Sequence, residues 1–212
     1  MKYDFHTHSK YSADGRGEPE LMVKKAIEQG LSGIAVTDHN TIRGGVEAKK
    51  YETSDFEVIV GSEIMTDRGE VIGLFLSEEV KSKSFMDVVD EIKDQNGFVV
   101  VPHPFDTIRG KSVFPKEEDV RFIDNMEVFN SRCVLTNYNK KAANFAGKNA
   151  VNIIAGSDAH FLREIGSGGV VTESENIYEA VAKGDFKVFG RRSTPVNLGL
   201  SEILRFWKML IE

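Results

Sequence analysis

Short apolar runs alternate along the chain with longer segments in which apolar residues recur at helical spacing. This alternation is typical of βα units, whose strands pair in parallel and whose crossovers are right-handed. Pro19 and Gly30 flank the first amphipathic segment, as expected at the first turn and the end of a helix. The predicted strands are 2–5, 33–37, 58–61, 71–76 (entered through a hairpin at 67–69), 98–101, 126–129, 152–155 and the short run 168–171. The predicted helices are 20–29, 43–50, 85–93, 136–148, 176–183 and an amphipathic C-terminal helix over 202–210.

Polar residues of an unusual kind stand where the predicted strands end. In chain order, the residues at five of these ends are His6, His39, Glu63, His103 and Asp158. About seven βα units in one short domain favour a small closed barrel over an open sheet, because the strand ends of a barrel converge on the face that carries its active site. The sequence therefore predicts a single α/β domain over residues 1–212.

Composition narrows the class of protein further. Hydrophobic residues make up 41% and charged residues 28%, as in an ordinary soluble domain. A net charge of −6 argues against a broad basic face for nucleic acid or membrane lipid, yet it allows a phosphorylated substrate if divalent cations are bound. Cys133 is the only cysteine, which favours a reducing compartment. With no signal peptide pattern and no apolar run of about 20 residues, we expect a cytoplasmic protein.

All five histidines of the chain belong to the strand-end set. His6 and His8 are two residues apart in an extended segment, so both imidazoles face one side, and Asp158 and His160 repeat this spacing. A single histidine at a strand end is more often a structural hydrogen-bonding residue than a ligand. All five histidines lie in the strand-end set with a carboxylate nearby, and this pattern favours a site for a cluster of divalent ions. Without a cysteine cluster, a thiolate zinc site or an iron–sulfur centre is excluded.

Five motifs along the chain resemble, in order, those of the PHP (polymerase and histidinol phosphatase) domain family. They are His-Thr-His-Ser (6–9) with Ser-Ala-Asp-Gly (12–15), Thr-Asp-His-Asn-Thr (37–41), Gly-Ser-Glu (61–63), Pro-His-Pro (102–104) and Gly-Ser-Asp-Ala-His (156–160). The resemblance covers residues 5–168 and is strongest to small stand-alone phosphatases, which act on nucleotides or histidinol phosphate. It implies a distorted (β/α)7 TIM-like barrel that holds two or three divalent ions, Mn, Zn or Fe.

Carried over motif by motif, the resemblance also assigns ligands. The first ion would take His6, His8, Glu63 and Asp158. The second would share Glu63 and use His103. The third would take Asp14, His39 and His160. Asp14 replaces a histidine of many members and favours Mn or Fe over Zn. Glu70 stands where several members have a histidine for the second ion, so it is either a ligand or an exposed hairpin residue.

Such a cluster suits the hydrolysis of phosphate esters. Cations cancel the repulsion between an anionic nucleophile and phosphate, and they lower the pKa of a bound water from about 15.7 to roughly 7. The chain has no recognisable side-chain nucleophile and no phosphate-binding glycine loop. We therefore expect a metal-bound hydroxide to hydrolyse the monoester of a small metabolite, with nucleotides first and sugar or histidinol-type phosphates second. Asp38 is expected to orient a ligand, and His39 or His160 to aid proton transfer.

Two arginines are candidates for phosphate contacts. Arg132 follows the strand 126–129 and is the stronger candidate, and Arg109 lies in the loop 105–116, which is either a lid or a plain connector. Glu127 is expected to contact the ligands and orient them without binding an ion itself.

Two other functions stay open at this stage. One is a phosphodiesterase or exonuclease acting on nucleic-acid ends, which the acidic charge disfavours. The other is a metal-binding PHP module without catalysis.

Overall fold

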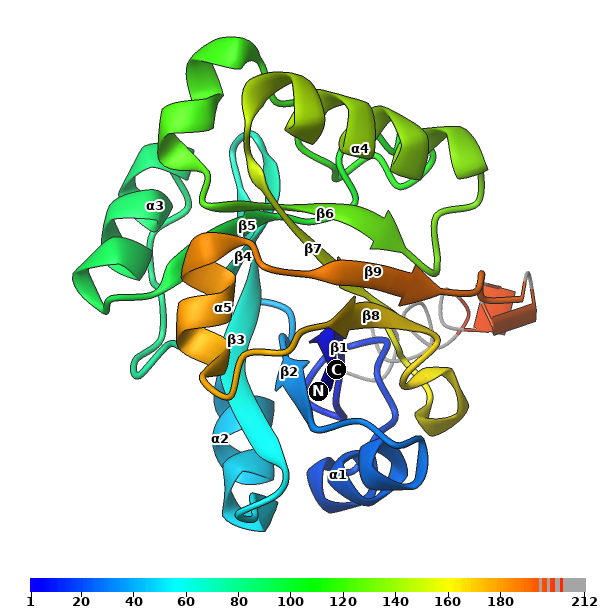
Figure 1. Cartoon of the computed structure of the whole chain (residues 1–212). Coiled ribbons are helices and arrows are strands. Elements are labelled where there is room, and N and C mark those ends of the chain that lie inside the picture. Colours follow the sequence, from blue (N-terminus) through cyan, green and yellow to red (C-terminus); the bar gives the residue numbers. More distant parts are fainter. Residues whose placement is uncertain (195, 198, 201–202, 204–212) are drawn as a thin grey trace.

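The computed structural model describes residues 1–194, 196–197, 199–200 and 203, and in this part of the chain nine strands form one sheet (Figure 1). The strands are β1 (Lys2–Thr7), β2 (Gly33–Val36), β3 (Glu57–Thr66), β4 (Gly69–Leu74), β5 (Phe98–Val101), β6 (Asn125–Asn130), β7 (Asn152–Gly156), β8 (Gly168–Val171) and β9 (Lys187–Gly190). The helices are α1 (Pro19–Glu28), α2 (Arg43–Ala48), α3 (Phe85–Asp94), α4 (Thr136–Asn149) and α5 (Ile177–Lys183).

The sheet curls into a nearly closed barrel. Its strand order is β7-β6-β5-β4-β3-β2-β1-β8-β9, and the pairs β1–β2, β2–β3, β5–β6 and β6–β7 are parallel. The open side is bridged just beyond the strand ends, where Thr7 pairs with Ala159 and the His8 amide donates to the Ala159 carbonyl at 2.8 Å. The helices lie around the outside of the sheet (Figure 1). The predicted α/β barrel is thereby confirmed.

The strands are not all parallel. The hairpin predicted at 67–69 is confirmed, whereas the other antiparallel pairs differ from the simple βα expectation. Strand β4 is antiparallel to β3 and β5, and β8 is antiparallel to β1 and β9. The turn at Asp67 and Arg68 between β3 and β4 is too short for a parallel crossover, which needs a dozen or more residues. Strand β9 was not predicted, because it is largely exposed and lacks an apolar alternation. The predicted helix 202–210 lies, apart from Ile203, outside the described residues.

The two faces of β1 show how the sheet positions the functional residues. Tyr3 and Phe5 are buried in a cluster with residues of β3, β4, β5 and β7, so they face the inside of the barrel. Asp4 pairs in register with Ile34, which packs on α1, so Asp4 faces the other side of the sheet. The register with β2 shifts after Asp4, and His6 lies at this irregularity, buried and with its ring in contact with Glu127. The end of β1 therefore places His6 through a local irregularity and not through a strict period of two.

Candidate metal centre

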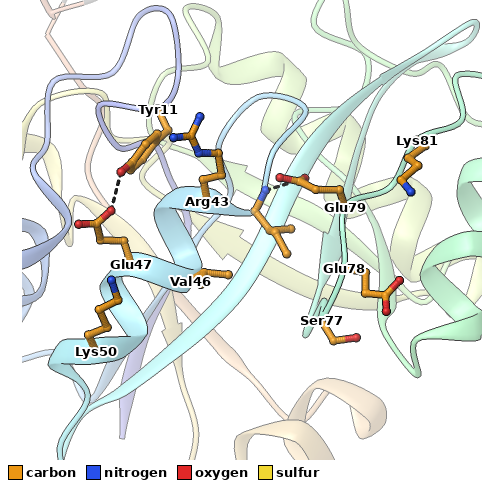
Figure 2. Close-up of a pocket in the computed structure, with 10 residues that line it drawn as sticks. Tyr11, Arg43, Val46, Glu47, Lys50, Ser77, Glu78, Glu79 and Lys81 are labelled. Atoms are coloured by element: carbon orange, nitrogen blue, oxygen red, sulfur yellow. Dashed lines mark hydrogen bonds between the residues drawn. The ribbon is translucent and has the colours of Figure 1, made fainter.

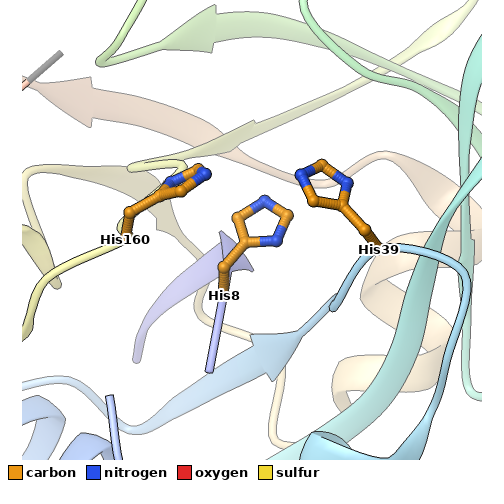
Figure 3. A group of neighbouring side chains, drawn as sticks. All are labelled: His8, His39 and His160. Carbon is orange, nitrogen blue, oxygen red and sulfur yellow. The ribbon is translucent and has the colours of Figure 1, made fainter. Parts of the chain in front are cut away.

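All nine predicted ligands converge at one end of the barrel. They come from β1, β3 and β4 and from the loops that follow β1, β2, β5 and β7. Figure 3 shows three of them, His8, His39 and His160, which reach a common space from separate segments and have ligand atoms within 4.8 Å of one another. Eight of the nine are buried, and the His39 side chain is 20% exposed. The nine are His6, His8, Asp14, His39, Glu63, Glu70, His103, Asp158 and His160.

The first group of ligands matches the set expected for the first ion. The Nε2 atoms of His6 and His8 are 3.6 and 3.3 Å from Asp158 Oδ1. The same two atoms are 3.5 and 3.4 Å from Glu63 Oε2. One oxygen of each carboxylate thus faces both imidazoles, so the four side chains enclose a single small volume.

Glu63 links this group to a second one. Its Oε1 is 2.8 Å from His103 Nε2, whereas its Oε2 is 3.1 Å from His39 Nδ1. Glu70 completes the second group, with Oε2 at 3.6 Å from His103 Nε2 and Oε1 at 3.9 Å from His39 Nδ1. Glu70 is 3% exposed, so its interpretation as an exposed hairpin residue was wrong. Because β4 is antiparallel, the first residues of this strand lie at the same end of the barrel as the last residues of β3.

Asp14 joins the remaining two histidines. Its Oδ2 is 3.4 Å from His39 Nε2 and 3.3 Å from His160 Nε2. His39 therefore presents one ring nitrogen to Asp14 and the other to Glu63, which places it between the second and third groups. For His39 and His160, this geometry supports the predicted ligand role, and their role in proton transfer stays a prediction.

The donor set fits divalent cations. Two ligand atoms that each lie about 2.1 Å from one ion are roughly 3.0 to 3.4 Å apart at octahedral or tetrahedral angles. The distances from Asp14 to His39 and His160, and from His8 to Glu63 and Asp158, are 3.3 to 3.4 Å and fall in this range. Asp14 Oδ1 and Asp158 Oδ1 are moreover buried without a hydrogen-bond partner. A buried carboxylate oxygen without a partner is costly, and a cation would satisfy it.

A second layer of contacts orients the imidazoles. Four histidines use Nδ1 for a protein contact: His6 with Glu127 Oε1 at 3.0 Å, His8 with Ser12 Oγ at 3.1 Å, His103 with Ser112 Oγ at 2.9 Å and His160 with the Asp158 carbonyl at 2.8 Å. Each contact leaves Nε2 directed at the carboxylates. Fixing one ring nitrogen in this way sets the tautomer and aims the other nitrogen at a metal. Glu127 has the supporting position that the sequence analysis expected.

Asp38 supports the centre through two serines. Its carboxylate accepts hydrogen bonds from Ser9 Oγ at 2.6 Å and from Ser12 Oγ at 2.7 Å. Since Ser12 also contacts His8, Asp38 orients His8 rather than the ring of its neighbour His39. Gly44 permits this network, because a Cβ atom there would lie 1.9 Å from Asp38 Oδ2. Asp38 is thus a positioning residue in this geometry.

Burial and neighbouring charges shift the pKa values of several ligands. Burial and two neighbouring imidazoles lower the pKa of His8 to about 3, so His8 is neutral at pH 7 and keeps a lone pair. Burial alone would lower the pKa of His6, but Asp158 and two further carboxylates raise it well above its usual value. His6 in turn holds the pKa of Glu63 low despite burial, whereas burial and Glu63 raise the pKa of Glu70. A bound cation would take over the charge that a protonated imidazole now supplies.

Two of the ligands have left-handed backbone conformations. His103 has a φ of +30° and Asp158 a φ of +55°, values that side-chain-bearing residues rarely adopt. The His103 amide donates to Glu127 Oε2 at 2.7 Å, which holds the backbone in place. Strain of this kind persists where the surrounding structure enforces it, typically at functional sites.

The two predicted phosphate-binding arginines have different surroundings. Arg132 is buried, and its Nη1 is 3.1 Å from both carboxylate oxygens of Glu164, so this geometry gives no support to the predicted phosphate contact. Arg109 is nearer the centre, with Nη1 2.6 Å from Asp158 Oδ2. Arg132 follows a strand end, which made it the stronger candidate. Its partner Glu164 lies 32 residues later, and no local sequence pattern indicates this pair.

Three further polar residues near the centre were not among the predicted ligands or phosphate-binding residues. Ser112 contacts His103, Asn130 donates to Asp158 Oδ2 at 3.2 Å, and Lys111 Nζ is 3.3 Å from Glu70 Oε1. Asn130 stands at a strand end, a signal that would have found it. Lys111 and Ser112 lie in a loop whose sequence gives no such signal.

A groove of about 560 Å³ lies between α2 and the segment 77–81, and none of the nine ligands is among its lining residues (Figure 2). The Tyr11 hydroxyl donates to Glu47 at 2.5 Å, and the Arg43 guanidinium lies 4.8 Å from the Tyr11 ring centroid. Tyr11 belongs to the loop that also carries Asp14. The groove lining further includes Ile42, Val46, Lys50, Ser77, Glu78, Glu79 and Lys81.

Comparison with known proteins assigns the family. The PHP domain profile matches residues 4–176, most of the chain. The chain belongs to the PHP domain family. The metal-dependent character of solved relatives and the groups of neighbouring His, Asp and Glu side chains agree with a centre for divalent ions, and the nine residues stay the predicted ligands. No helix in the described part of the chain has the length and apolar content needed to cross a bilayer.

Relatives and solved structures extend this assignment. Protein MJ1587 of Methanocaldococcus jannaschii is 42% identical over 146 residues, which are 62% of this chain and 82% of the relative. A 5'-3' exoribonuclease of Haemophilus influenzae is 41% identical over 78 residues, 34% of this chain and 28% of that enzyme. A two-domain protein of Bacteroides vulgatus, described as containing a PHP-like metal-dependent phosphoesterase, shares the fold, with a TM-score of 0.76, 21% identity and coverage of 96% of this chain and 69% of that one.

Proposed function

We propose that this PHP domain is a metal-dependent phosphoesterase that hydrolyses the phosphate monoester of a small metabolite. The observation that carries the proposal is the buried centre itself, in which Glu63 contacts four imidazoles and joins the two groups that would hold neighbouring ions. A carboxylate shared between cations is the arrangement that phosphoryl hydrolysis uses to act on an anionic substrate. All nine predicted ligand positions carry a side chain that can bind a metal, which argues against a module without catalysis.

Different residues of the centre have different proposed roles in the reaction. When bound, divalent ions supply the positive charge that binds phosphate and acidifies water. The nine ligands hold these ions, and Glu127 and Asp38 fix the orientation of the ligands. Arg109 directs three of its five N–H groups to Asp158, Asp106 and Asn130 and is 22% exposed, so its remaining N–H groups are proposed to contact a phosphate oxygen.

The groove supports a nucleotide as the preferred substrate. Tyr11 supplies an aromatic ring, and Arg43, Lys50 and Lys81 supply positive charge along the same groove. An aromatic ring beside cations is suited to a base and a sugar-phosphate (Figure 2). We propose that the part of the substrate beyond the reacting phosphate lies toward this groove. Sugar or histidinol-type phosphates are the next candidates.

A second candidate function is the removal of nucleotides from the end of a nucleic acid. The match to an exoribonuclease favours it, although that match covers only 34% of this chain. The net charge of −6 and the glutamates in the groove, Glu47, Glu78 and Glu79, argue against a long nucleic-acid track. The two candidates differ in the bond they break, so a diester substrate separates them.

The decisive experiment combines metal analysis with a substrate screen. Protein purified without chelators is analysed for bound metals, and phosphate release is measured with Mn over mononucleotides, bisphosphates, sugar phosphates and short oligonucleotides. Two or more ions per chain with release from monoesters would support the proposal. Release of nucleotides from oligonucleotides alone would favour the second candidate. Asp158→Asn serves as the control that should lose both metal and activity.

A further inference from the structure

Lys111 lies at the edge of the metal centre, beside the ligand Glu70. Its Nζ is 3.3 Å from Glu70 Oε1, and the Lys111 side chain is 35% exposed whereas that of Glu70 is 4% exposed. The ammonium group therefore stands at the boundary between solvent and the buried ligands. A substrate that enters from solvent meets this charge before it reaches Glu70.

The backbone fixes the place of Lys111. Its carbonyl accepts a hydrogen bond from the Glu70 amide at 2.8 Å. Gly69 has a φ of +118°, and a Cβ atom there would lie 2.7 Å from the same carbonyl oxygen, so the loop packs directly on the hairpin. On the other side Ser112 contacts His103. Anchored between the hairpin and a ligand histidine, Lys111 presents its charge in a prearranged position.

Lys111 has fewer protein contacts than Arg109, the other cationic side chain at the centre. Among the described residues, Arg109 and Lys111 are the basic side chains other than histidine within 4.0 Å of the ligand carboxylates. Arg109 contacts three protein groups, whereas the contact found for the Lys111 ammonium is Glu70 alone. An ion on Glu70 would supply the charge that Lys111 now supplies to it, and the ammonium group would then be available for another anion.

We propose that Lys111 binds the phosphate of the substrate and selects monoesters over diesters. Glu70 holds the ammonium group in place before the substrate arrives, and a non-bridging phosphate oxygen then replaces Glu70 as its partner. A monoester carries up to two negative charges on its terminal oxygens and a diester carries one, so a cation at this point favours the monoester. This inference rests on the proposed phosphoesterase function and adds the basis of its specificity.

Kinetics of Lys111→Met test the proposal. Lys116→Met is the matched control, because Lys116 ends the same loop, its side chain is 74% exposed, and its ammonium group pairs at 3.7 Å with Glu118, which is not a ligand. We expect Lys111→Met to raise KM for p-nitrophenyl phosphate by about 10- to 100-fold, the usual effect of one charged hydrogen bond. KM for bis(p-nitrophenyl) phosphate should change much less, metal content should equal that of the parent, and Lys111→Arg should restore most of the loss.

A binding measurement supplies a readout that does not depend on turnover. Calorimetric titration of the Mn-loaded protein with inorganic phosphate should show affinity at least about tenfold weaker in Lys111→Met than in the parent and in Lys116→Met. Unchanged phosphate affinity and unchanged KM would overturn the proposal. Loss of metal with normal phosphate affinity would overturn it too, because Lys111 would then serve only Glu70. If the parent releases no phosphate from any ester, the proposed function fails, and the titration still decides the role of Lys111.

Discussion

Replacing Glu127 by glutamine tests whether the residues that hydrogen-bond to the ligands and orient them affect metal affinity. Glu127 Oε1 is 3.0 Å from His6 Nδ1, and Oε2 accepts from the His103 amide at 2.7 Å and from Asn130 Nδ2 at 2.9 Å. The carboxylate thus uses both oxygens as acceptors, and three donors depend on it. His6 is left with Nε2 facing the ligand carboxylates.

A glutamine cannot satisfy all three donors. If its oxygen faces His6, its NH₂ group faces the N–H groups of His103 and Asn130. If the amide is turned around, its NH₂ group faces His6 Nδ1, and the ring must then carry its proton on Nε2, which removes the lone pair that a metal needs. Both orientations weaken the centre, although the side chain keeps its shape.

The expected cost follows from the position of Glu127 behind a ligand. Loss of such a contact typically weakens metal binding by about 10- to 100-fold, or about 1.4 to 2.8 kcal/mol. The effect should be greatest for the ion held by His6, with a smaller effect on the ion held by His103. The ion held by Asp14 and His160 should stay bound, because Glu127 has no contact with either residue among the described interactions.

Competition with a chromogenic chelator, followed by elemental analysis, measures this effect ion by ion. Glu179→Gln is the matched control, since Glu179 is 57% exposed and pairs with Lys183 on the surface of α5. Metal affinities of Glu127→Gln equal to those of the parent and of this control would refute the reasoning.

Three further substitutions probe other parts of the centre. Glu63→Gln should lose at least one metal equivalent and nearly all phosphate release, and full metal content by elemental analysis would contradict the assignment of Glu63 as a shared ligand. Gly44→Ala forces a Cβ atom against Asp38, so we expect a loss of about 1 to 3 kcal/mol in urea unfolding, and unchanged stability would speak against this close contact. Arg132→Ala leaves Glu164 without its ion-pair partner and should cost about 3 kcal/mol in the same assay, while an increase in KM at parental stability would restore the predicted phosphate contact.

The ligands could be predicted from sequence because two simple rules act together. Side chains alternate along strands, and the ends of parallel strands meet on one face of a barrel. The second rule places His6, His103 and Asp158. It does not place Glu70, which stands at the start of a strand. The predicted hairpin at 67–69 brings Glu70 to the ligand end, but the sequence left open whether its side chain binds an ion or is exposed.

Contacts between distant side chains could not be predicted. Nothing near Arg132 in the sequence indicates that it pairs with Glu164, and nothing near Lys111 indicates that it reaches Glu70. Such pairs depend on how loops from different strands pack, which local patterns do not encode. The same holds for β9, which pairs with β8 through its backbone while its side chains are largely exposed.

The bridge between Thr7 and Ala159 has a consequence for the order of events during folding. It joins the segment that carries the first ligands to the segment that carries the last, and the nearby contact of Asp4 with Ser157 spans 153 positions. Contacts of such long range form late, because closing a large loop costs entropy before any contact rewards it. During synthesis, His6 emerges long before His160, so the complete centre cannot assemble until most of the domain has been made. In refolding experiments, metal uptake therefore reports the closure of the barrel and not the formation of its individual strands and helices.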